Sequence, residues 1–294
     1  MIKQTLIFSN PAELSLRNGQ MVISQRALDR DTARPIADIG IVIIENQLVR
    51  MTIPLLNELA RNNAIVVLCD NSHLPQSILT SFTANSTQAE TLRAQTTASA
   101  PLQKQAWKQV VESKIRNQSA LLDKLGKEGR VLSPYYNNVK SGDADNREGA
   151  AARIYWTKLF GDDFSRDRYG QPPNDLLNYG YSILRAATIR AILGSGLSAA
   201  FGIFHHNRYN PFPLGDDLME PYRPFIDEIV FNLYKNNCYE IDRTSKTELV
   251  KALNRDVLIG RTIKPLQLAL SSTTASFSSY LRQDIRKLSL PEFP

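Results

Sequence analysis

The first part of the chain, up to residue 84, has the hydrophobic pattern of short strands separated by turns. Asn18 and Gly19 stand between two runs of alternating polar and apolar residues, which is a strong signal for a β-hairpin. Apolar runs predict further strands over residues 36–46 and 64–70, and residues 52–63 have the pattern of a short helix. We therefore expect a small domain dominated by strands.

From residue 85 onward, apolar residues recur every three or four positions, which is the spacing of one helix face. Residues 101–126 show this most clearly, through Trp107, Val110, Val111, Ile115, Leu121, Leu122 and Leu125. Further helices are expected within 87–100, 146–161, 174–196, 216–237 and 261–288. Pro221 and Pro224 should bend or restart the helix at 216–237.

The predicted fold class is α+β with several domains. A small β-rich N-terminal domain is expected at 1–84 and a helical connection at 85–100. A larger all-α C-terminal domain is expected at 101–294.

Composition narrows the class of protein. The 294 residues are 43% hydrophobic, enough for a sizeable core. No apolar run is long enough to span a bilayer, and the N-terminus lacks the apolar stretch of a signal peptide. Cys69 and Cys238 are far apart and are expected to be buried thiols rather than a disulfide or a zinc site. We therefore expect a cytoplasmic protein without a membrane partner.

The charge is moderately basic. The net charge is +6 and the pI is about 9.3, with Lys and Arg spread along the chain rather than gathered in one block. This balance permits a polyanionic partner such as nucleic acid, and it does not by itself establish one.

The first candidate for a functional site lies at residues 205–220. His205 and His206 end an apolar stretch, and an acidic cluster with Asp217 and Glu220 follows. These two acids are three residues apart, so on a helix they share a face. The group is either a metal site or a core histidine followed by the acidic first turn that many helices carry.

Glu148 is the second candidate, because small residues surround it in the segment NREGAAAR. Small neighbours on a helix leave room for a ligand, although an ordinary solvated glutamate would fit as well. Together, Glu148, His205 and an acid at 217 or 220 would form a mostly hard ligand set. Such a set suits Mg²⁺ or Mn²⁺ and, in a basic protein, phosphodiester chemistry on DNA or RNA.

Four motifs in order resemble those of the CRISPR adaptation integrase family Cas1, in the short form found beside Cas9 systems. NREGAAARIYW resembles its Glu motif, LNYGYSILR an intervening helix, GIFH its Gly-x-x-His motif, and LGDDLMEPYRP its acidic motif. The resemblance covers essentially the whole chain. Many members of the wider family have Asp where this chain has Glu220, which leaves the part played by Asp217 open.

The resemblance implies Glu148, His205 and Glu220 as ligands of Mg²⁺ or Mn²⁺. Asp217 and His206 would be further ligands or would support the ligands. The same resemblance offers two supporting residues of the catalytic site on the intervening helix, Asn178 and Tyr179.

The activity implied is that of a DNA integrase and endonuclease acting in CRISPR spacer acquisition. Family members join the 3′-hydroxyl ends of short duplex DNA to the CRISPR repeat by transesterification. The partners implied are a second copy of the chain, bound through the β-rich domain, the small protein Cas2 in a heterohexamer, and the Cas9 effector. The alternatives are a non-catalytic DNA-binding scaffold of the same complex and an unrelated metal-dependent phosphohydrolase.

Four arginines flank the candidate ligands and are expected either to contact the DNA backbone or to form internal salt bridges: Arg147, Arg153, Arg208 and Arg223. A further basic set is expected on the exposed face of the helix at 101–126: Lys104, Lys108, Lys114, Arg116 and Lys124. No recognition helix for reading bases is evident, so DNA shape and phosphate spacing should matter most.

Overall fold

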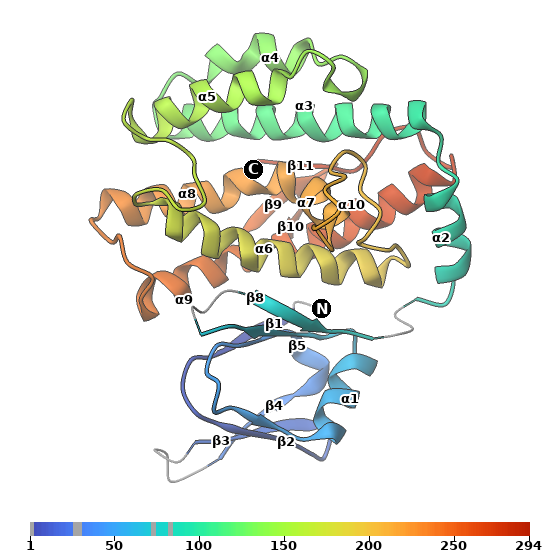
Figure 1. Ribbon diagram of the computed structural model, residues 1–294, viewed down its shortest axis with the longest axis vertical. Helices are drawn as coiled ribbons and strands as arrows, with labels where there is room; N and C mark the ends of the chain where they lie inside the picture. Colours follow the sequence, from blue (N-terminus) through green and yellow to red (C-terminus); the bar gives the residue numbers. More distant parts are fainter. Residues whose placement is uncertain (1–2, 26–30, 72–74, 82–84) are drawn as a thin grey trace. The chain divides into compact units, whose positions relative to one another are not determined.

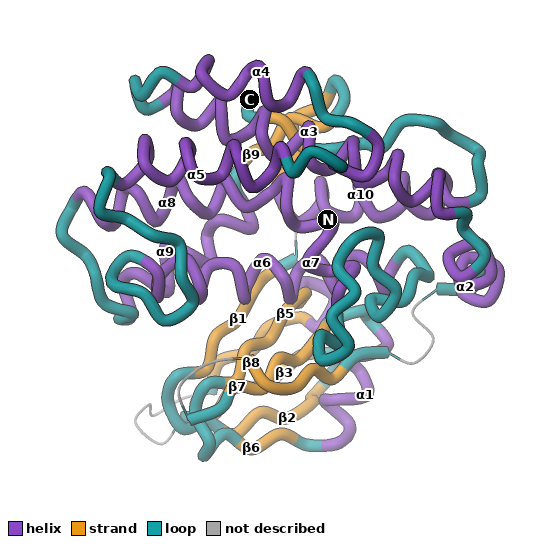
Figure 2. The backbone as a smooth tube through the Cα atoms, turned by 45° about the horizontal axis from the view of Figure 1, so that its top comes forward, coloured by secondary structure: helices purple, strands orange, loops and turns teal. Residues whose placement is uncertain are grey.

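The computed structural model describes residues 3–25, 31–71, 75–81 and 85–294 (Figure 1). The chain forms two compact units, Met1–Ser86 and Thr87–Pro294. The first is rich in strands and the second is mostly helical, so the predicted fold class is confirmed (Figure 2). The domain boundary that we predicted after residue 84 adjoins residues 82–84, which lie outside the described residues.

The first unit contains two four-stranded sheets. One has the order β1-β5-β7-β8, with β1 (Gln4–Phe8), β5 (Ile39–Ile44) and β7 (Ile65–Cys69) parallel and β8 (Pro75–Leu79) antiparallel. The other has the order β4-β3-β2-β6, from β4 (Thr32–Pro35), β3 (Gln20–Ser24), β2 (Glu13–Arg17) and β6 (Arg50–Met51). Helix α1 (Ile53–Arg61) contributes side chains to the same core as the two sheets.

The predicted hairpin joins β2 to β3 with a turn at Asn18 and Gly19. Both residues have positive φ, 50° and 70°, as a two-residue turn of this kind requires. The core of this unit combines apolar side chains from both sheets and from α1, among them Leu14, Val42 and Leu59. Alternating apolar residues on the strands thus face one shared interior.

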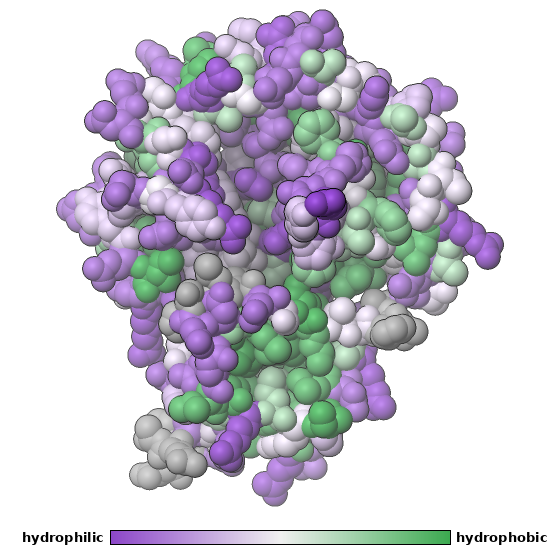
Figure 3. All heavy atoms as spheres, viewed as in Figure 1, coloured by the Kyte–Doolittle hydropathy of each residue, from purple (hydrophilic) through white to green (hydrophobic). Residues whose placement is uncertain are grey.

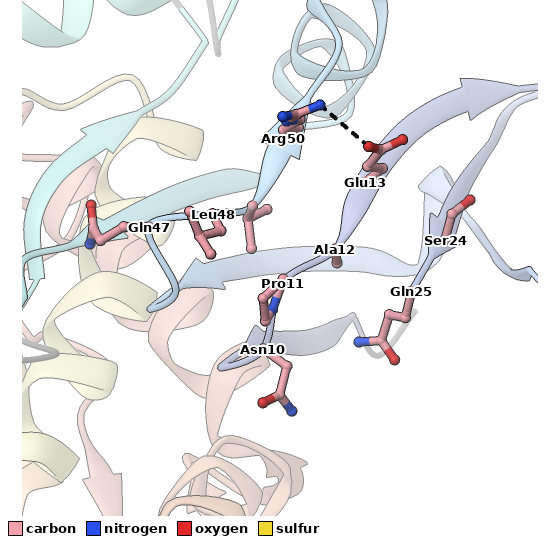
Figure 4. Close-up of a pocket in the computed structure, with 10 residues that line it drawn as sticks. Asn10, Pro11, Ala12, Glu13, Ser24, Gln25, Gln47, Leu48 and Arg50 are labelled. Carbon is pink, nitrogen blue, oxygen red and sulfur yellow. Dashed lines mark ion pairs between the residues drawn. The ribbon is translucent and has the colours of Figure 1, made fainter. Parts of the chain in front are cut away.

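A recess of about 750 Å³ opens beside β2 and β6 in this unit (Figure 4). Its lining includes Asn10, Ser24 and Gln47, together with an ion pair between Arg50 and Glu13 at 3.6 Å. Amides, a hydroxyl and a solvent-exposed ion pair do not form a catalytic group. The candidate metal ligands predicted from the sequence all lie in the second unit.

The second unit is built around the long helix α3 (Ala100–Lys124). In Figure 1, α3 runs between the α4–α5 pair on one side and α7, α8 and α10 on the other. Its other helices are α2 (Gln88–Thr96), α4 (Ser133–Asn137), α5 (Arg147–Phe160), α6 (Asn174–Gly194), α7 (Pro213–Met219), α8 (Arg223–Lys235), α9 (Arg243–Lys251) and α10 (Leu266–Leu281). Short 3₁₀ turns lie at Ile36–Asp38 in the first unit, and at Gly129–Leu132, Ser141–Asp143, Glu220–Tyr222 and Ala252–Asn254 in the second.

The second unit is not all-α as we predicted. A three-stranded antiparallel sheet, ordered β10-β9-β11, joins β9 (Asp256–Ile259), β10 (Thr262–Pro265) and β11 (Pro291–Glu292). Gly260, with φ of 64°, lets the chain turn between the first two strands, so helix α10 begins only after Pro265. Helix α9 was also absent from our prediction.

Proline divides the predicted helix at 216–237, as expected. Helix α7 ends at Met219, a 3₁₀ turn, η4, covers Glu220–Tyr222, and α8 follows directly. Pro221 and Pro224 lack the backbone N–H that an α-helix needs, which explains the break in regular geometry. The break lies at Glu220, one of the predicted ligands.

Two expectations from composition can also be compared with the structure. No helix among the described residues is both long and apolar enough to cross a membrane. Neither cysteine forms a disulfide, but only Cys69 is buried, whereas Cys238 is exposed and so departs from our expectation of two buried thiols.

Candidate metal centre

Glu148 is fixed at the N-terminus of α5 by residues that cap this helix. The Asp143 carboxylate accepts hydrogen bonds from the backbone N–H groups of Arg147 (2.8 Å) and Glu148 (3.1 Å). The side chain of Asn146, the N-cap residue, accepts one from Gly149 (3.1 Å). Because these bonds use the N–H groups that a helix start leaves unpaired, they hold the first turn in place.

Glu220 begins the 3₁₀ turn η4, which is anchored to α3. The side-chain amide of Asn117 donates hydrogen bonds to the carbonyl oxygens of Pro221 (2.8 Å) and Pro291 (2.9 Å). Glu220 is 3% exposed. Its backbone is therefore held against α3, and its carboxylate is almost completely removed from solvent.

The carboxylates of Glu148 and Glu220 meet at the ammonium group of Lys114, which projects from α3. Nζ of Lys114 lies 2.5 Å from Oε1 of Glu148 and 2.6 Å from Oε2 of Glu220. Arg223 contacts the other oxygen of Glu220 at 2.9 Å. Two carboxylates and two cations thus form one charge-balanced cluster.

The cluster shifts the pKa values of its members. Burial lowers the pKa of Lys114, but Glu220 and Glu148 outweigh it and raise that pKa above its ordinary value. Burial raises the pKa of Glu220, but Arg223 and Lys114 together hold it below its usual range. Both residues are therefore charged at neutral pH.

Lys114 contradicts our prediction of an exposed basic face on this helix. It is 8% exposed, and it follows Trp107 by seven residues and Val110 by four. At helical spacing these positions share one face, so Lys114 belongs to the apolar stripe. A lysine within an apolar stripe was the signal that sequence reasoning overlooked.

His205 is held by Asp217 and by an aromatic stack. Its Nδ1 lies 2.6 Å from Oδ1 of Asp217. The ring of Phe204 stacks on Trp107 with centroids 4.5 Å apart, and His205 meets the edge of Trp107 at 5.8 Å. With Nδ1 facing a carboxylate, Nε2 is the nitrogen that remains for a ligand, which is how metal-binding histidines are commonly held.

Asp217 is fully buried at the base of the turn that carries His205. Its carboxylate accepts hydrogen bonds from the backbone N–H groups of Ile203 (2.5 Å), Phe204 (3.0 Å) and His205 (3.3 Å). Together with the imidazole, these donors occupy both carboxylate oxygens. The geometry therefore favours a supporting role for Asp217 rather than direct metal binding.

The donor set fits a divalent cation in its chemistry. Two carboxylates from α5 and η4 already converge on one cationic atom, and the imidazole of His205 is near enough to contribute to the lowered pKa of Glu220. Among the described residues, however, no three His, Cys, Asp or Glu side chains stand close enough together to hold a metal ion. The ammonium group of Lys114 occupies the position between the carboxylates of Glu148 and Glu220.

A recess of about 540 Å³ adjoins His205 in the same unit. Its lining mixes apolar side chains such as Ile203 and Phe277 with polar ones, among them His206, Arg208 and Gln103. His206 is exposed and lines this recess together with His205. The recess gives His205 access to solvent and gives a ligand room beside it.

The four arginines expected near DNA differ in their surroundings. Arg153 and Arg208 are exposed, and Arg208 donates to the hydroxyl of Tyr209 at 2.5 Å. Arg147 has a long contact of 3.9 Å to Asp145. Arg223 instead forms the internal salt bridge with Glu220, as the alternative interpretation held, and its guanidinium lies over the ring of Tyr181.

Asn178 and Tyr179 lie near the start of α6. The side chain of Asn178 accepts from Arg166 and donates to the carbonyl of Arg168, both at 2.7 Å. Tyr179 is buried, and Lys246 lies over its ring at 5.5 Å. These contacts fix the loop before α6 and the packing of α9.

The chain matches the family model described as CRISPR associated protein Cas1 over residues 5–258. A protein named CRISPR-associated endonuclease Cas1, from Neisseria meningitidis serogroup C, is 34% identical over 297 aligned residues. That alignment covers 99% of this chain and 97% of the relative.

Two solved structures share the fold. A casposase bound to integration product has a TM-score of 0.80 at 21% identity, with 98% of this chain and 93% of the casposase chain covered. A Cas6-RT-Cas1–Cas2 complex has a TM-score of 0.71 at 18% identity, with 96% of this chain and 35% of that chain covered. At such identities the likeness concerns the fold.

Proposed function

This chain belongs to the Cas1 family of CRISPR-associated proteins, and we propose that it is a metal-dependent DNA integrase and endonuclease of spacer acquisition. The observation that carries the proposal is the convergence of Glu148 and Glu220 on one cationic atom, with His205 oriented by Asp217. The endonuclease name of the N. meningitidis relative and the integration product in the casposase structure support the same activity.

Glu148, His205 and Glu220 are the residues proposed to hold Mg²⁺ or Mn²⁺. When bound, the cation would polarise a phosphodiester oxygen and offset charge that develops in the transition state. Asp217 keeps the Nε2 nitrogen of His205 turned outward, and the backbone of Glu148 is fixed by the cap of α5. Because these ligand groups are already oriented in the folded protein, less free energy is needed to arrange them when the cation binds.

The DNA end is proposed to enter the recess beside His205. Arg208 lines this recess, and Arg153 is exposed five residues after Glu148 on α5. Arginine binds phosphate oxygens through paired N–H groups, and the net charge of +6 favours approach of a polyanion. In strand joining, the 3′-oxygen of the incoming strand would bond to phosphorus as the bond to the departing 3′-oxygen of the repeat breaks.

The proposed partners are double-stranded DNA, a second copy of the chain, Cas2 and the Cas9 effector. Cas1–Cas2 complexes among the structures of the same fold support Cas2. Exposed apolar side chains in the first unit, Leu48 and Ile53, support a protein interface there. Cas9 rests on the family resemblance alone.

Strand joining tests this function. Fluorescent duplex with free 3′-hydroxyl ends would be mixed with a supercoiled plasmid carrying a CRISPR array, Cas2, and Mn²⁺ or Mg²⁺. We expect the parent protein to transfer label to the plasmid. Glu148→Gln, His205→Ala and Glu220→Gln should each lose this transfer. His206→Ala should reduce it far less than His205→Ala, because His205 is the imidazole that Asp217 orients.

Other results would support the alternative functions. Failure of a folded, DNA-binding parent to join strands, with no effect of EDTA, would favour a non-catalytic scaffold. Hydrolysis of mononucleotides without preference for duplex DNA would favour a phosphohydrolase. Equal loss of joining in His205→Ala and His206→Ala would contradict the choice of ligand.

A further inference from the structure

The most unusual polar group in the second unit is the ammonium of Lys114. Its side chain is 10% exposed, and it lies 2.5 Å from a carboxylate oxygen of Glu148 and 2.6 Å from one of Glu220. Lysine is rarely buried unless it is paired. Here it bridges two carboxylates that come from separate elements, α5 and η4.

The charges of this cluster balance without any bound ion. Glu148 and Glu220 supply two negative charges, and Lys114 and Arg223 supply two positive ones. A divalent cation placed between the same carboxylates would leave the cluster with an excess of positive charge. Like charges a few ångströms apart in a buried site repel strongly, so Lys114 and a dication cannot share this position.

Of the two cations, Lys114 is better suited to leave. Its charge sits at the end of a flexible four-carbon stem, and a single ammonium makes few directional contacts. Arg223 contacts the opposite oxygen of Glu220 and also lies over the ring of Tyr181, so it is held on two sides. Arg223 can therefore stay while Lys114 moves.

We propose that Lys114 is a displaceable internal cation, which occupies the metal position in the metal-free protein and must swing away before a divalent cation binds. This inference rests on the proposed function, because it takes Glu148 and Glu220 as metal ligands. The protein then has a closed state, held by Lys114, and an open state that binds metal. Apparent metal affinity is the intrinsic affinity reduced by the fraction of open protein.

Mn²⁺ binding to the full-length protein tests the inference, with free Mn²⁺ followed by its electron paramagnetic resonance signal. Lys114→Met keeps the length of the side chain and removes its charge. If the open state is populated at about a tenth or less, the variant should bind Mn²⁺ about tenfold more tightly, or better. Lys108→Met on the same helix, whose lysine pairs with Glu112 at 3.6 Å and is partly exposed, should leave the affinity unchanged.

A labelling experiment on the parent protein avoids any effect of substitution on folding. Lysines would be acetylated briefly with and without Mn²⁺, and the modified positions quantified by mass spectrometry. Displacement predicts several-fold faster acetylation of Lys114 when Mn²⁺ is present, with no change at Lys108. Equal acetylation of Lys114 in both conditions would overturn the inference.

The outcomes separate this inference from the proposed function. If Glu220→Gln abolishes Mn²⁺ binding while Lys114→Met leaves the affinity equal or weaker, the metal centre stands and displacement is wrong. If Lys114→Met binds Mn²⁺ where the parent does not, displacement is supported. If neither binds Mn²⁺ at this centre, both the inference and the metal-dependent function are overturned.

Discussion

Gly202 shows how a single residue determines the position of His205. A Cβ atom at Gly202 would lie 2.5 Å from the carbonyl oxygen of His205 and 3.0 Å from Oδ2 of Asp217. These neighbours are a backbone atom and a fully buried carboxylate, so neither can move easily. The glycine of the GIFH segment is thus needed for close approach of the turn to Asp217.

We expect Gly202→Ala to destabilise the protein by about 1–3 kcal/mol, as overpacking of a closed site does, and to reduce strand joining. Gly194→Ala is the matched control, because nothing lies within 4 Å of the Cβ position there. Thermal unfolding and strand joining of both variants would be compared with the parent. Equal behaviour of the two variants would show that the turn tolerates a side chain.

Asp227 is a buried carboxyl group whose environment opposes ionisation. It accepts a hydrogen bond from the hydroxyl of Tyr155 at 2.8 Å and another from Tyr181. Burial raises its pKa to about 6, although these two hydroxyls, Arg223 and Arg166 act in the opposite direction. The folded protein therefore holds this proton more tightly than the unfolded chain, where the ordinary value is 3.8.

The contribution of Asp227 to stability is complete below about pH 4 and is lost as the pH rises through about 6. The free energy of unfolding falls by roughly 3 kcal/mol, because the pKa values of about 6 and 3.8 differ by about two units and each unit corresponds to about 1.4 kcal/mol. We expect Asp227→Asn to remove this pH dependence. The melting temperature of the variant relative to the parent should therefore increase between pH 4.5 and 7. A difference that stays constant over this range would contradict the raised pKa.

At the scale of elements, α3 organises the centre through one face. Trp107 supports Phe204, Lys114 bridges the two glutamates, and Asn117 holds the η4 turn. These three residues are seven and three positions apart, so they project from the same side of the helix. The single helix thus positions groups from α5, η4 and the loop before α7.

We expect Asn117→Ala to destabilise the protein by about 1–3 kcal/mol, because it removes the side-chain donor to the buried carbonyl of Pro221. It also removes one of the two side-chain donors to the Pro291 carbonyl, the other being Ser113. It should also weaken Mn²⁺ binding, since Glu220 precedes Pro221. Gln105→Ala, at an exposed position of the same helix, should change stability by less than about 0.5 kcal/mol. Denaturant unfolding measures both effects, and a similar small change in both would argue against the anchoring role.

The elements that could be predicted from the sequence are those set by local patterns. The hairpin at Asn18 and Gly19 and the break at Pro221 follow from residues that restrict the backbone directly. The sheet that includes β11 was missed because Pro291 pairs with Ile259, and no short-range pattern reports such pairing. Strand pairing at long range depends on tertiary contacts.

The candidate site was predictable in its residue types but not in its arrangement. The motifs point to Glu148, His205 and Glu220, and the structure brings the two glutamates together on Lys114. The burial of Lys114 could have been predicted from its place in the apolar stripe of α3. Its role could not, because its two partners come from other elements. Whether these three residues bind metal remains a prediction for the experiments above.

At the scale of the whole molecule, dimerisation through the first unit is the proposed route to joining two DNA ends. Among the described residues of that unit, Leu48 and Ile53 are large apolar side chains that are 70% and 66% exposed. Covering apolar side chains of this size with a partner would remove apolar area from water and so favour association. They are therefore the candidates for contact with a second copy.

We expect the double variant Leu48→Asp with Ile53→Asp to be a folded monomer, because a charge placed in an apolar contact would have to be buried without a partner. Its affinity for Mn²⁺ should match that of the parent, whereas joining of two ends should fall. Ile263→Asp is the matched control, since Ile263 is 61% exposed but belongs to the second unit. Sedimentation velocity would compare the three proteins. If the double variant is still a dimer and Ile263→Asp is a monomer, the dimer interface lies in the helical unit instead. The two DNA ends would then be joined in a different arrangement of the two copies.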